Sequence, residues 1–280
     1  MIILDGKKLA QKILSDLTQE ISQIKNCQPR LDIILVGSDP ASFKYVENKN
    51  KKAKELGIIG EIHHFAQFSK TEEIINKIQQ LNSDPLVNGI MVQLPLPHQI
   101  DQSRVLNTIS FKKDVDGLTA TNLGLLFQNH THAFIPATPM GIMKLLKEYN
   151  YDFIGKNAVI IGRSPIVGIP LSALLLKENA TVTICHSKTK NLKEITKTAD
   201  ILITAISKSE YFTFEFIKTG ATIIDVSTNI NPISGKITGD INFDSVCPFV
   251  SQISPVPGGV GPMTIACLLE NTFTAWKRQN

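Results

Sequence analysis

Apolar residues along the first half of the chain gather into short runs, and the segments between them carry apolar residues at helical spacing. Three runs rich in aliphatic and β-branched residues predict strands: 31–36, 58–65 and 89–94. Asp39 and Pro40 supply an N-cap and a first helical residue, so we expect a helix that runs to Leu56 and stops at Gly57. A second helix is expected over 71–81. Strands that alternate with helices are typical of a parallel sheet covered on both faces.

The second half of the chain repeats this alternation. The same patterns predict strands at 157–161, 181–185, 201–205 and 222–226, with helices at 167–178 and 191–198. Thr138 and Pro139 mark the start of a helix that leads from the first half into the second, and a closing helix should reach about Lys277. The predicted fold class is therefore α/β, with two domains and a cleft between them.

Composition is ordinary for a globular protein and argues against several classes of partner. The chain has 280 residues, 42% hydrophobic and 19% charged, and its net charge of +4 is too small to indicate nucleic acid. Asp5 interrupts the first apolar residues, and no apolar run approaches the roughly 18 residues that cross a membrane, so we expect neither a signal peptide nor a membrane partner. The cysteines are far apart: Cys27, Cys185, Cys247 and Cys267. They predict reduced core thiols in a cytoplasmic protein, without disulfides or bound metal.

The segment 159–168 predicts a nucleotide-binding turn. A β-branched strand ends at Gly162, and a short polar turn leads at Gly168 into a helix, whose unpaired N–H groups can hold a phosphate. Arg163 follows the first glycine, and Ser187 stands where an NAD site has its acidic ribose-binding residue, so together they favour NADP over NAD. The glycines are six residues apart and do not form the usual Gly-x-Gly-x-x-Gly motif, so the alternative is an ordinary βα turn with an exposed arginine.

Lys49 lies in the middle of a mostly apolar stripe on the helix that begins at Pro40. Helical spacing puts six residues on this face: Ser42, Tyr45, Val46, Lys49, Ala53 and Leu56. If burial removes water from Lys49, its pKa falls and the amine becomes a proton acceptor near neutral pH. The alternative is that the side chain extends along the apolar surface until its amine reaches solvent.

Three other segments are candidates for ligand binding. Gln93 lies at the carboxyl end of a predicted strand, where open α/β sheets bind ligands, although a strand-end amide can also simply bond to backbone. Residues 114–117 form a predicted turn, whose Asp116 could also hold a polar heterocycle or pair with a lysine. The glycines of 258–261 let a ligand approach the backbone closely, or serve only to bend the chain.

Nine segments, taken in order along the chain, match motifs of one enzyme family: 4–7, 36–42, 45–51, 93–97, 113–117, 136–141, 162–170, 180–187 and 255–264. Together they resemble the bifunctional methylenetetrahydrofolate dehydrogenase/methenyltetrahydrofolate cyclohydrolase family over nearly the whole chain. Any one of these segments could match by chance. The ordered set of nine is highly specific.

The resemblance implies catalytic and substrate-binding roles for four residues of the folate pocket: Tyr45, Lys49, Gln93 and Asp116. Tyr45 would pack on the aminobenzoyl ring of the folate, and Asp116 would hold its pterin. Lys49 and Gln93 would serve the chemistry.

The resemblance also implies a division of the chain and its ligands. Residues 1–138 would form the folate-binding domain, 139–262 a Rossmann-like NADP-binding domain, and 263–280 a helix that packs back on the first domain. Five residues would contact NADP: Gly162, Arg163, Ser164, Ser187 and Thr228. Pro257 and Gly258 would contact the substrate. Members of the family are typically homodimers, and no metal is expected.

The implied activity is a two-step reaction of one-carbon metabolism on tetrahydrofolate derivatives. A hydride passes from 5,10-methylenetetrahydrofolate to NADP, and water then opens the methenyl product to 10-formyltetrahydrofolate. A dehydrogenase without the second step is one rival. A regulatory protein that binds a nucleotide without turnover, or a related dehydrogenase that acts on another small ring, are others. The intact set of four pocket residues argues against a protein that only binds.

The chain departs from the usual family pattern at several positions. Thr119 and Ala120 replace a common His-Pro pair, and Ala137 replaces a cysteine. Ser207 and Ser227 stand where the family has glycine, at the ends of two predicted strands. A side chain at either position could crowd the dinucleotide and so alter its affinity and the preference for NADP.

Overall fold

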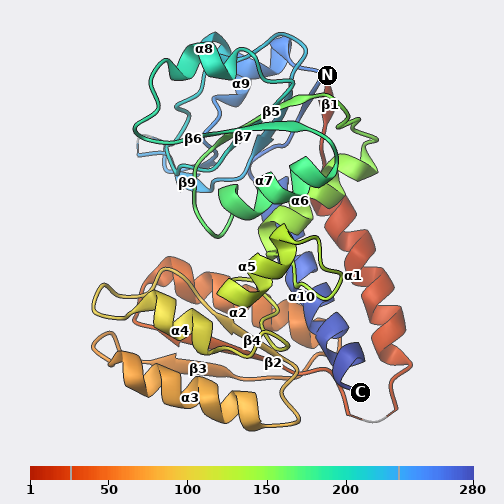
Figure 1. Cartoon of the computed structure of the whole chain (residues 1–280), viewed down its shortest axis with the longest axis vertical. Coiled ribbons are helices and arrows are strands. Elements are labelled where there is room, and N and C mark those ends of the chain that lie inside the picture. The colour runs from red at the N-terminus through yellow and green to blue at the C-terminus, as the bar shows by residue number, and fades with distance from the viewer. Residues whose placement is uncertain (26, 233) are drawn as a thin grey trace. The chain divides into compact units, whose positions relative to one another are not determined.

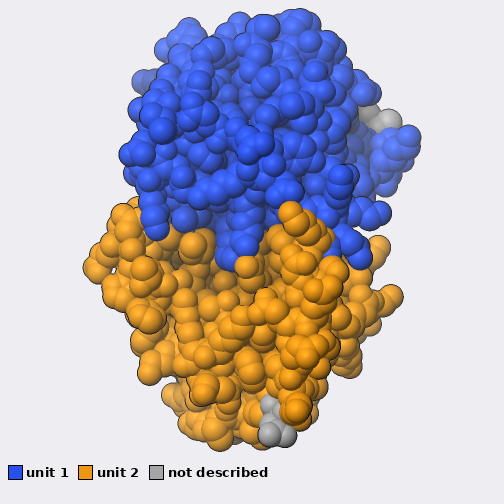
Figure 2. All heavy atoms as spheres, turned by 90° about the vertical axis from the view of Figure 1, so that its right-hand side faces the viewer, with its two compact units in different colours: residues 1–11, 138–264 blue, residues 12–137, 265–280 orange. Residues whose placement is uncertain are grey.

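The computed structural model describes residues 1–25, 27–232 and 234–280. Figure 2 shows two compact units: unit 1 comprises residues 1–11 and 138–264, and unit 2 comprises residues 12–137 and 265–280. Residues 1–11 thus belong to unit 1, whereas the predicted first domain comprises residues 1–138. Each unit has its own parallel sheet, as the alternating pattern predicts.

The sheet of unit 2 has three strands in the order β3-β2-β4 (Figure 1). The central strand β2 (Leu31–Val36) pairs in parallel with β3 (Ile62–Phe65) and with β4 (Gly89–Val92). Every residue of β2 and β4 is buried, and all but Asp32 are apolar or glycine, as expected for strands covered on both faces. The predicted strands at 31–36 and 89–94 are confirmed, the second with an earlier end.

The predicted strand 58–65 is wrong in its first half. Gly60 has φ +150°, and a Cβ at this position would lie 1.8 Å from the carbonyl oxygen of Leu31. The backbone therefore bends at Gly60, and Ile59 makes only an isolated bridge to Arg30. Regular pairing begins at Ile62.

The helices that lie wholly or largely in unit 2 are α1 (Gly6–Ser22), α2 (Pro40–Glu55), α3 (Thr71–Ser83), α4 (Gln102–Thr108), α5 (Ala120–Phe127) and α10 (Val260–Gln279). Helix α2 starts as predicted, because the Asp39 side chain accepts a hydrogen bond from Ser42 N at 2.8 Å. It ends before Gly57, which has φ +84°. Helices α3 and α4 pack against each other, and α2 packs on β2 (Figure 1).

Unit 1 contains a six-stranded sheet in the order β1-β11-β8-β7-β5-β6 (Figure 1). Its strands are β1 (Ile2–Ile3), β5 (Asn157–Ile161), β6 (Thr181–Cys185), β7 (Ile201–Thr204), β8 (Thr222–Asp225) and β11 (Gln252–Ile253). All pairings are parallel. The chain runs from β5 outward to β6 and then returns to β7 on the other side of β5, which creates a topological switch point at the carboxyl end of β5.

Shorter elements complete unit 1: α6 (Ala137–Glu148), α7 (Gly168–Lys177), α8 (Leu192–Thr196), α9 (Phe243–Val246), the 3₁₀ turns η1 (Phe214–Phe216) and η2 (Cys247–Phe249), and the antiparallel pair β9 (Asn229–Ile230) and β10 (Ile237–Thr238). A buried cluster that includes Leu202, Phe212 and Ile223 forms the core on one face of the sheet. The predicted helix 191–198 is confirmed in its centre only, because Asn191 has φ +54° and lies outside the helix.

The four cysteines are free thiols, but they do not all lie in the core. Cys185 and Cys267 are buried as expected. Cys247 is only partly buried and Cys27 is exposed, so the expectation of core cysteines is wrong for these two. In the part of the chain that the structure describes, no helix is both long and apolar enough to span a membrane.

The turn from β5 into α7 is tight because both of its glycines approach backbone atoms. A Cβ on Gly162, which has φ +128°, would lie 2.6 Å from the carbonyl oxygen of Ala205. A Cβ on Gly168 would lie 2.0 Å from the carbonyl oxygen of Gly162. Any side chain at either position would displace the backbone, so the turn requires both glycines.

Gly168→Ala should therefore lower the free energy of unfolding by about 1–3 kcal/mol or more, because the new methyl group displaces the turn. The control is Gly124→Ala, on the exposed face of α5, where a Cβ meets open space. This second change should raise stability by roughly 0.5–1 kcal/mol, since alanine loses less backbone entropy in a helix. Denaturant unfolding measures both. Effects of the same sign would contradict the close packing of the turn.

Candidate active site

Lys49 projects from α2 toward the carboxyl end of β4. Four residues of the predicted stripe are buried: Ser42, Val46, Ala53 and Leu56. Lys49 itself is partly exposed, and its Nζ donates a hydrogen bond to Gln93 Oε1 at 3.0 Å and lies 3.6 Å from Met91 Sδ. The amine is therefore turned toward the sheet and does not extend fully into solvent, which favours the first of the two sequence interpretations.

Gln93 is fixed at both ends of its side chain. It directly follows β4, and its backbone N–H donates to the carbonyl oxygen of Ile34 at 2.9 Å. Its Nε2 donates to the carbonyl oxygen of Leu94 at 2.6 Å, which leaves Oε1 to accept from Lys49. The amide thus makes the backbone bond expected at a strand end and also contacts Lys49, while its contact with a ligand stays a prediction.

The loop after residue 113 is organised by the buried carboxylate of Asp114. This carboxylate accepts hydrogen bonds from the N–H groups of Leu118 and Thr119, at 3.1 and 2.8 Å, and from Asn122 Nδ2 at 2.8 Å. Gly117 has φ +69°, and a Cβ there would lie 2.5 Å from the carbonyl oxygen of Phe134. The turn chemistry of this segment therefore belongs to Asp114 and Gly117, and Asp116 is left for another role.

Asp116 lies close to Lys49. The charges of these two groups act on each other, and Asp114, two residues before Asp116, forms a parallel bridge with Ile90 of β4. The structure thus brings Lys49, Gln93 and Asp116 together at one edge of the three-stranded sheet.

Burial perturbs both charged groups of this cluster. It raises the pKa of Asp116 to about 6, an effect that the positive charge of Lys49 opposes and the negative charge of Asp114 reinforces. Burial likewise lowers the pKa of Lys49, and the charge of Asp116 opposes that shift. A lysine with a lowered pKa close to a carboxyl group with a raised pKa is suited to move protons near neutral pH.

Tyr45 lies one helical turn before Lys49 on α2. Its side chain is 45% exposed, so the ring belongs to the accessible part of the predicted stripe and not to the core. An exposed aromatic ring one turn from Lys49 can pack against a planar group that reaches the cluster.

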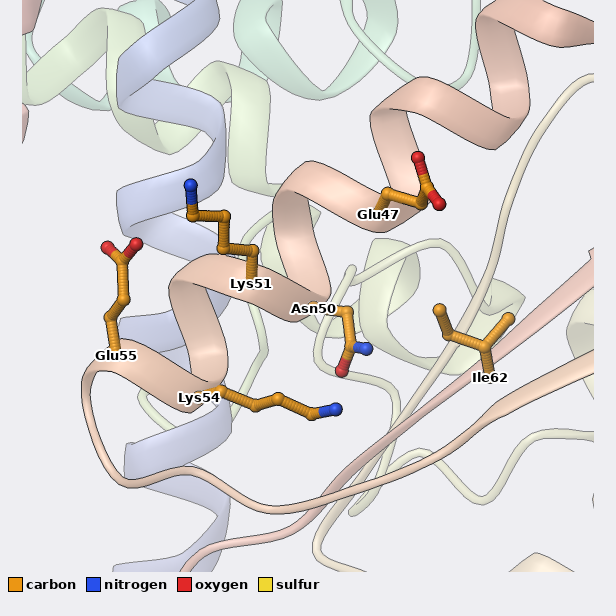
Figure 3. Close-up of a pocket in the computed structure, with 6 residues that line it drawn as sticks. All are labelled: Glu47, Asn50, Lys51, Lys54, Glu55 and Ile62. Carbon is orange, nitrogen blue, oxygen red and sulfur yellow. The ribbon is translucent and has the colours of Figure 1, made fainter.

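An open hollow on another face of α2 contains none of the predicted site residues. Figure 3 shows its lining: Glu47, Asn50, Lys51, Lys54 and Glu55 of α2, with Ile62 of β3. The helical period puts these α2 residues roughly opposite Lys49. Lys51 and Lys54 are exposed, so their charges are solvated.

In unit 1, Arg163 and Ser187 follow neighbouring strand ends. Ile161 of β5 and Cys185 of β6 are register partners, and the N–H of Gly162 donates to the carbonyl oxygen of Cys185 at 2.9 Å. Arg163 and Ser187 are both exposed just beyond these ends. A guanidinium and a hydroxyl beside a tight glycine turn, at the N-terminus of a ten-residue helix, suit a phosphate.

The remaining predicted cofactor residues lie at the same edge of this sheet. Ser164 follows Arg163, and its Oγ accepts a hydrogen bond from Ile166 N at 3.1 Å, which shapes the turn. Thr228 is exposed three residues after the end of β8. Across residues 1–25, 27–232 and 234–280, no group of three or more His, Cys, Asp or Glu side chains is arranged to hold a metal ion.

Pro257 and Gly258 lie in unit 1, between β11 and α10. The carbonyl oxygen of Gly258 accepts a hydrogen bond from Lys7 N at 2.8 Å, so this loop is tied to the start of α1. These two residues belong to a different unit from the Lys49 cluster. Their contact with the substrate stays a prediction.

Comparison with known proteins assigns both halves of the chain to one family. Residues 4–116 match the family model described as tetrahydrofolate dehydrogenase/cyclohydrolase, catalytic domain. Residues 136–280 match the model for the NAD(P)-binding domain of the same family. The chain belongs to the tetrahydrofolate dehydrogenase/cyclohydrolase family. The predicted resemblance and the two-domain α/β fold are confirmed.

Relatives match over the full length. A bifunctional protein FolD from Thermodesulfovibrio yellowstonii is 50% identical over 99% of this chain and 97% of its own. The crystal structure of the bifunctional enzyme FolD from Campylobacter jejuni is 44% identical, with a TM-score of 0.97 and complete coverage of both chains. The dehydrogenase-cyclohydrolase of Trypanosoma brucei, solved with NADP and an inhibitor, is 34% identical with a TM-score of 0.95, covering 99% of this chain and 98% of its own.

Two of the residues that depart from the family pattern are buried. Thr119 lies next to the Asp114 loop, and Ala137 lies at the start of α6. Thr119 is 2% exposed and caps α5, because its Oγ1 accepts a hydrogen bond from Asn122 N at 3.2 Å. Thr119 therefore caps α5 with its side chain and donates its backbone N–H to Asp114. Ala137 is buried as the first residue of α6, and nothing in the structure explains why it replaces cysteine.

The other two departures, Ser207 and Ser227, contact each other. The N–H of Ser207 donates to Ser227 Oγ at 3.1 Å. Ser227 is 7% exposed, so its hydroxyl is turned into the protein and does not crowd the strand end. Ser207 remains exposed.

Sequence reasoning did not find two buried carboxyl groups behind the unit 1 strand ends. Asp225 is buried, and its pKa is raised to about 7 by burial and by the neighbouring charge of Asp240, while backbone donors oppose the shift. Asp240 is fully buried. The only local signal was the pair Gly239-Asp240, which by itself predicts a turn.

Asp116→Asn should make the protein more stable above about pH 6. The native pKa of about 6 exceeds the unfolded value of roughly 3.9, so ionisation of Asp116 destabilises the fold increasingly from about pH 4 to 6 and then by a constant amount. Partial exposure reduces the effect to about 1–3 kcal/mol. Urea unfolding between pH 4.5 and 7.5 measures it, with the exposed Asp16→Asn as control. A gain that does not change with pH would contradict the raised pKa.

Proposed function

We propose that this chain oxidises 5,10-methylenetetrahydrofolate with NADP and then hydrolyses the methenyl product to 10-formyltetrahydrofolate. The observation that carries the proposal is the bond from Lys49 Nζ to Gln93 Oε1, at 3.0 Å, beside Asp116. Membership of a dehydrogenase/cyclohydrolase family and the activities named for its relatives support both steps.

In this proposal, unit 2 binds the folate. The Asp116 carboxylate accepts hydrogen bonds from the pterin ring, and the exposed ring of Tyr45 packs on the aminobenzoyl group. Both contacts orient the one-carbon bridge of the folate toward Lys49 and Gln93. Pro257 and Gly258 are proposed as further substrate contacts.

Unit 1 binds the dinucleotide. Arg163 and Ser187 hold the 2′-phosphate through a charge-assisted bond and a hydroxyl bond, and Gly162 lets the pyrophosphate approach the turn before α7. Ser164 and Thr228 are proposed as further contacts. When bound, NADP supplies the hydride acceptor for the first step. The protein contributes orientation, which can account for much of the rate of such a transfer.

Lys49 moves the protons of the second step. Water attacks the carbon of the methenyl cation, and the neutral amine of Lys49 takes a proton from that water. The resulting carbinolamine then loses its bond to N5, which takes up a proton, while the carbinol oxygen releases its own proton and becomes the formyl carbonyl. One proton is released overall. The positive charge of the substrate itself favours the neutral form of Lys49, and Gln93 holds the amine in place.

A dehydrogenase that lacks the hydrolytic step is the second candidate function. The two candidates differ in whether Lys49 takes part in hydrolysis. We also propose that the protein is a cytoplasmic homodimer. The dimer rests on the family resemblance, and the four free cysteines are consistent with a reducing compartment. Light scattering at micromolar concentration tests the dimer.

Lys49→Met should abolish cyclohydrolase activity while part of the dehydrogenase activity survives, so methenyltetrahydrofolate accumulates. Methionine keeps much of the apolar stem and removes the amine, and loss of an acid–base group costs roughly a hundred- to ten-thousand-fold in rate. Absorbance of the methenyl product and of reduced NADP follows both steps. Lys44→Met, at an exposed position of the same helix, should leave both activities unchanged. Normal hydrolysis of added methenyltetrahydrofolate by the Lys49 variant would remove this residue from the mechanism.

Arg163→Ala should weaken the binding of NADP far more than the binding of NAD. A charge-assisted hydrogen bond contributes about 1.5–3 kcal/mol, which corresponds to ten- to a hundred-fold in binding. Michaelis constants for both cofactors measure the change, with Lys190→Ala, an exposed lysine outside the proposed site, as control. Equal losses with NADP and NAD would show that Arg163 has only a structural role.

A further inference from the structure

Asp240 is a buried carboxylate that holds two loops of unit 1 together. Its oxygens accept hydrogen bonds from the N–H groups of Ile206 and Lys208, at 2.8 and 2.7 Å, in the loop after β7. They also accept bonds from Ser227 Oγ at 2.7 Å and from Asn229 Nδ2 at 3.2 Å, at the end of β8 and the start of β9. Because one carboxylate receives donors from both loops, it fixes the position of each relative to the other.

Ser227 joins the same two loops a second time. Its hydroxyl donates to Asp240 and accepts from the N–H of Ser207 at 3.1 Å. Ser207 has φ +54°, a conformation that residues other than glycine seldom adopt. The bond from Ser207 to the buried hydroxyl therefore helps to hold the loop after β7 in an unfavourable backbone conformation.

These loops adjoin the glycine turn after β5. Thr204 of β7 is the register partner of both Ile161 of β5 and Asp225 of β8, so the three strands end at one edge. A Cβ on Gly162 would lie 2.6 Å from the carbonyl oxygen of Ala205, the first residue after β7. The braced loops thus lie on one side of the glycine turn.

Arg163 and Ser187 lie on the other side of that turn, at the ends of β5 and β6. A dinucleotide that spans a switch point extends across the strand ends in both directions from the turn. If Arg163 and Ser187 hold the 2′-phosphate, the loops after β7 and β8 face the half of the dinucleotide remote from that phosphate.

We propose that Ser227 is a positioning residue for the dinucleotide: with Asp240, it holds Ser207 and the loop after β7 in the conformation that binds the half remote from the 2′-phosphate. The proposal rests on the proposed function, because it takes unit 1 to bind a dinucleotide. Ser227 acts through the loop and does not itself touch the ligand. It therefore affects NADP and NAD equally, whereas Arg163 discriminates between them.

The first test is Ser227→Ala, which keeps the Cβ and removes only the hydroxyl. The dissociation constants of NADP and of NAD, measured by titration calorimetry, should each rise about tenfold, and their ratio should not change. Ser245→Ala is the matched control, because its hydroxyl in α9 accepts a backbone N–H bond of the same length, from Phe214 at 3.1 Å. This control should leave both constants unchanged. A larger loss for NADP than for NAD would contradict the proposed position of the braced loop.

The second test is a double-mutant cycle with Ser207→Gly. Glycine adopts a positive φ without help, so this change alone should alter binding less than threefold, about the scatter expected between uncoupled variants. In the Ser227→Ala background it should restore most of the lost affinity, because the loop no longer needs the hydroxyl to hold its conformation. If the effects of the two changes simply add, the coupling is absent and the proposal is overturned.

Thermal unfolding separates positioning from general stability. If Ser227→Ala lowers the melting temperature and leaves both dissociation constants unchanged, Ser227 has only a structural role and the proposal is wrong. If the unaltered protein binds neither dinucleotide, the proposed function itself fails. If the unaltered protein and every variant bind both dinucleotides equally well, only the proposal for Ser227 fails.

Discussion

Parallel pairing of buried strands decides where functional side chains can lie in both units. The strands pair in register and point the same way, so every loop that follows a strand emerges at one edge of its sheet. In unit 2 this edge carries Gln93 after β4 and Asp116 in the adjoining loop. In unit 1 it carries Gly162 after β5 and Ser207 after β7. Residues far apart in the sequence meet there because the backbone hydrogen bonds of the sheet align the ends of its strands.

Loops at such an edge have few apolar residues to fix them, and in this chain buried carboxylates take over that role. Asp114 accepts hydrogen bonds from two backbone N–H groups and one side-chain amide, and so fixes the loop that carries Asp116. Asp240 gathers donors from the loops after β7 and β8 in the same way. A carboxylate can accept several hydrogen bonds at once, and each charged bond is stronger than a neutral one, so the gain offsets the loss of hydration. In unit 2, Asp114 and not Asp116 therefore makes the hydrogen bonds that fix this loop.

Much of this arrangement could be predicted from the sequence, because it depends on local patterns. The Asp39 cap, the stop at Gly57 and the aliphatic runs of β2 and β5 each carry their own signal. Other features depend on contacts between distant residues and have no local signal. The Asp114–Gly117 segment predicts a turn, but its sequence does not indicate that the carboxylate of Asp114, and not that of Asp116, accepts the hydrogen bonds that fix this turn. The bend at Gly60 arises from its approach to Leu31, nearly thirty residues away in the sequence. The bond between Ser207 and Ser227 likewise depends on how the ends of β7 and β8 lie in the folded sheet, which neither local sequence indicates.

Lys49 and Asp116 show how one pair of groups can serve the second of two proposed steps. Burial disfavours a charge on either group, while each charge favours the other, so the protonation of the pair depends on the balance between these two effects. Methylenetetrahydrofolate brings no charge at its one-carbon bridge and leaves this balance in place. The methenyl product brings a positive charge, which disfavours the ammonium of Lys49 and favours the carboxylate of Asp116. A neutral amine beside an anionic carboxylate is the state that a general base requires. The product of the first step would thus prepare the residues that hydrolyse it, and hydrolysis would remove the cation and return the pair to its starting balance.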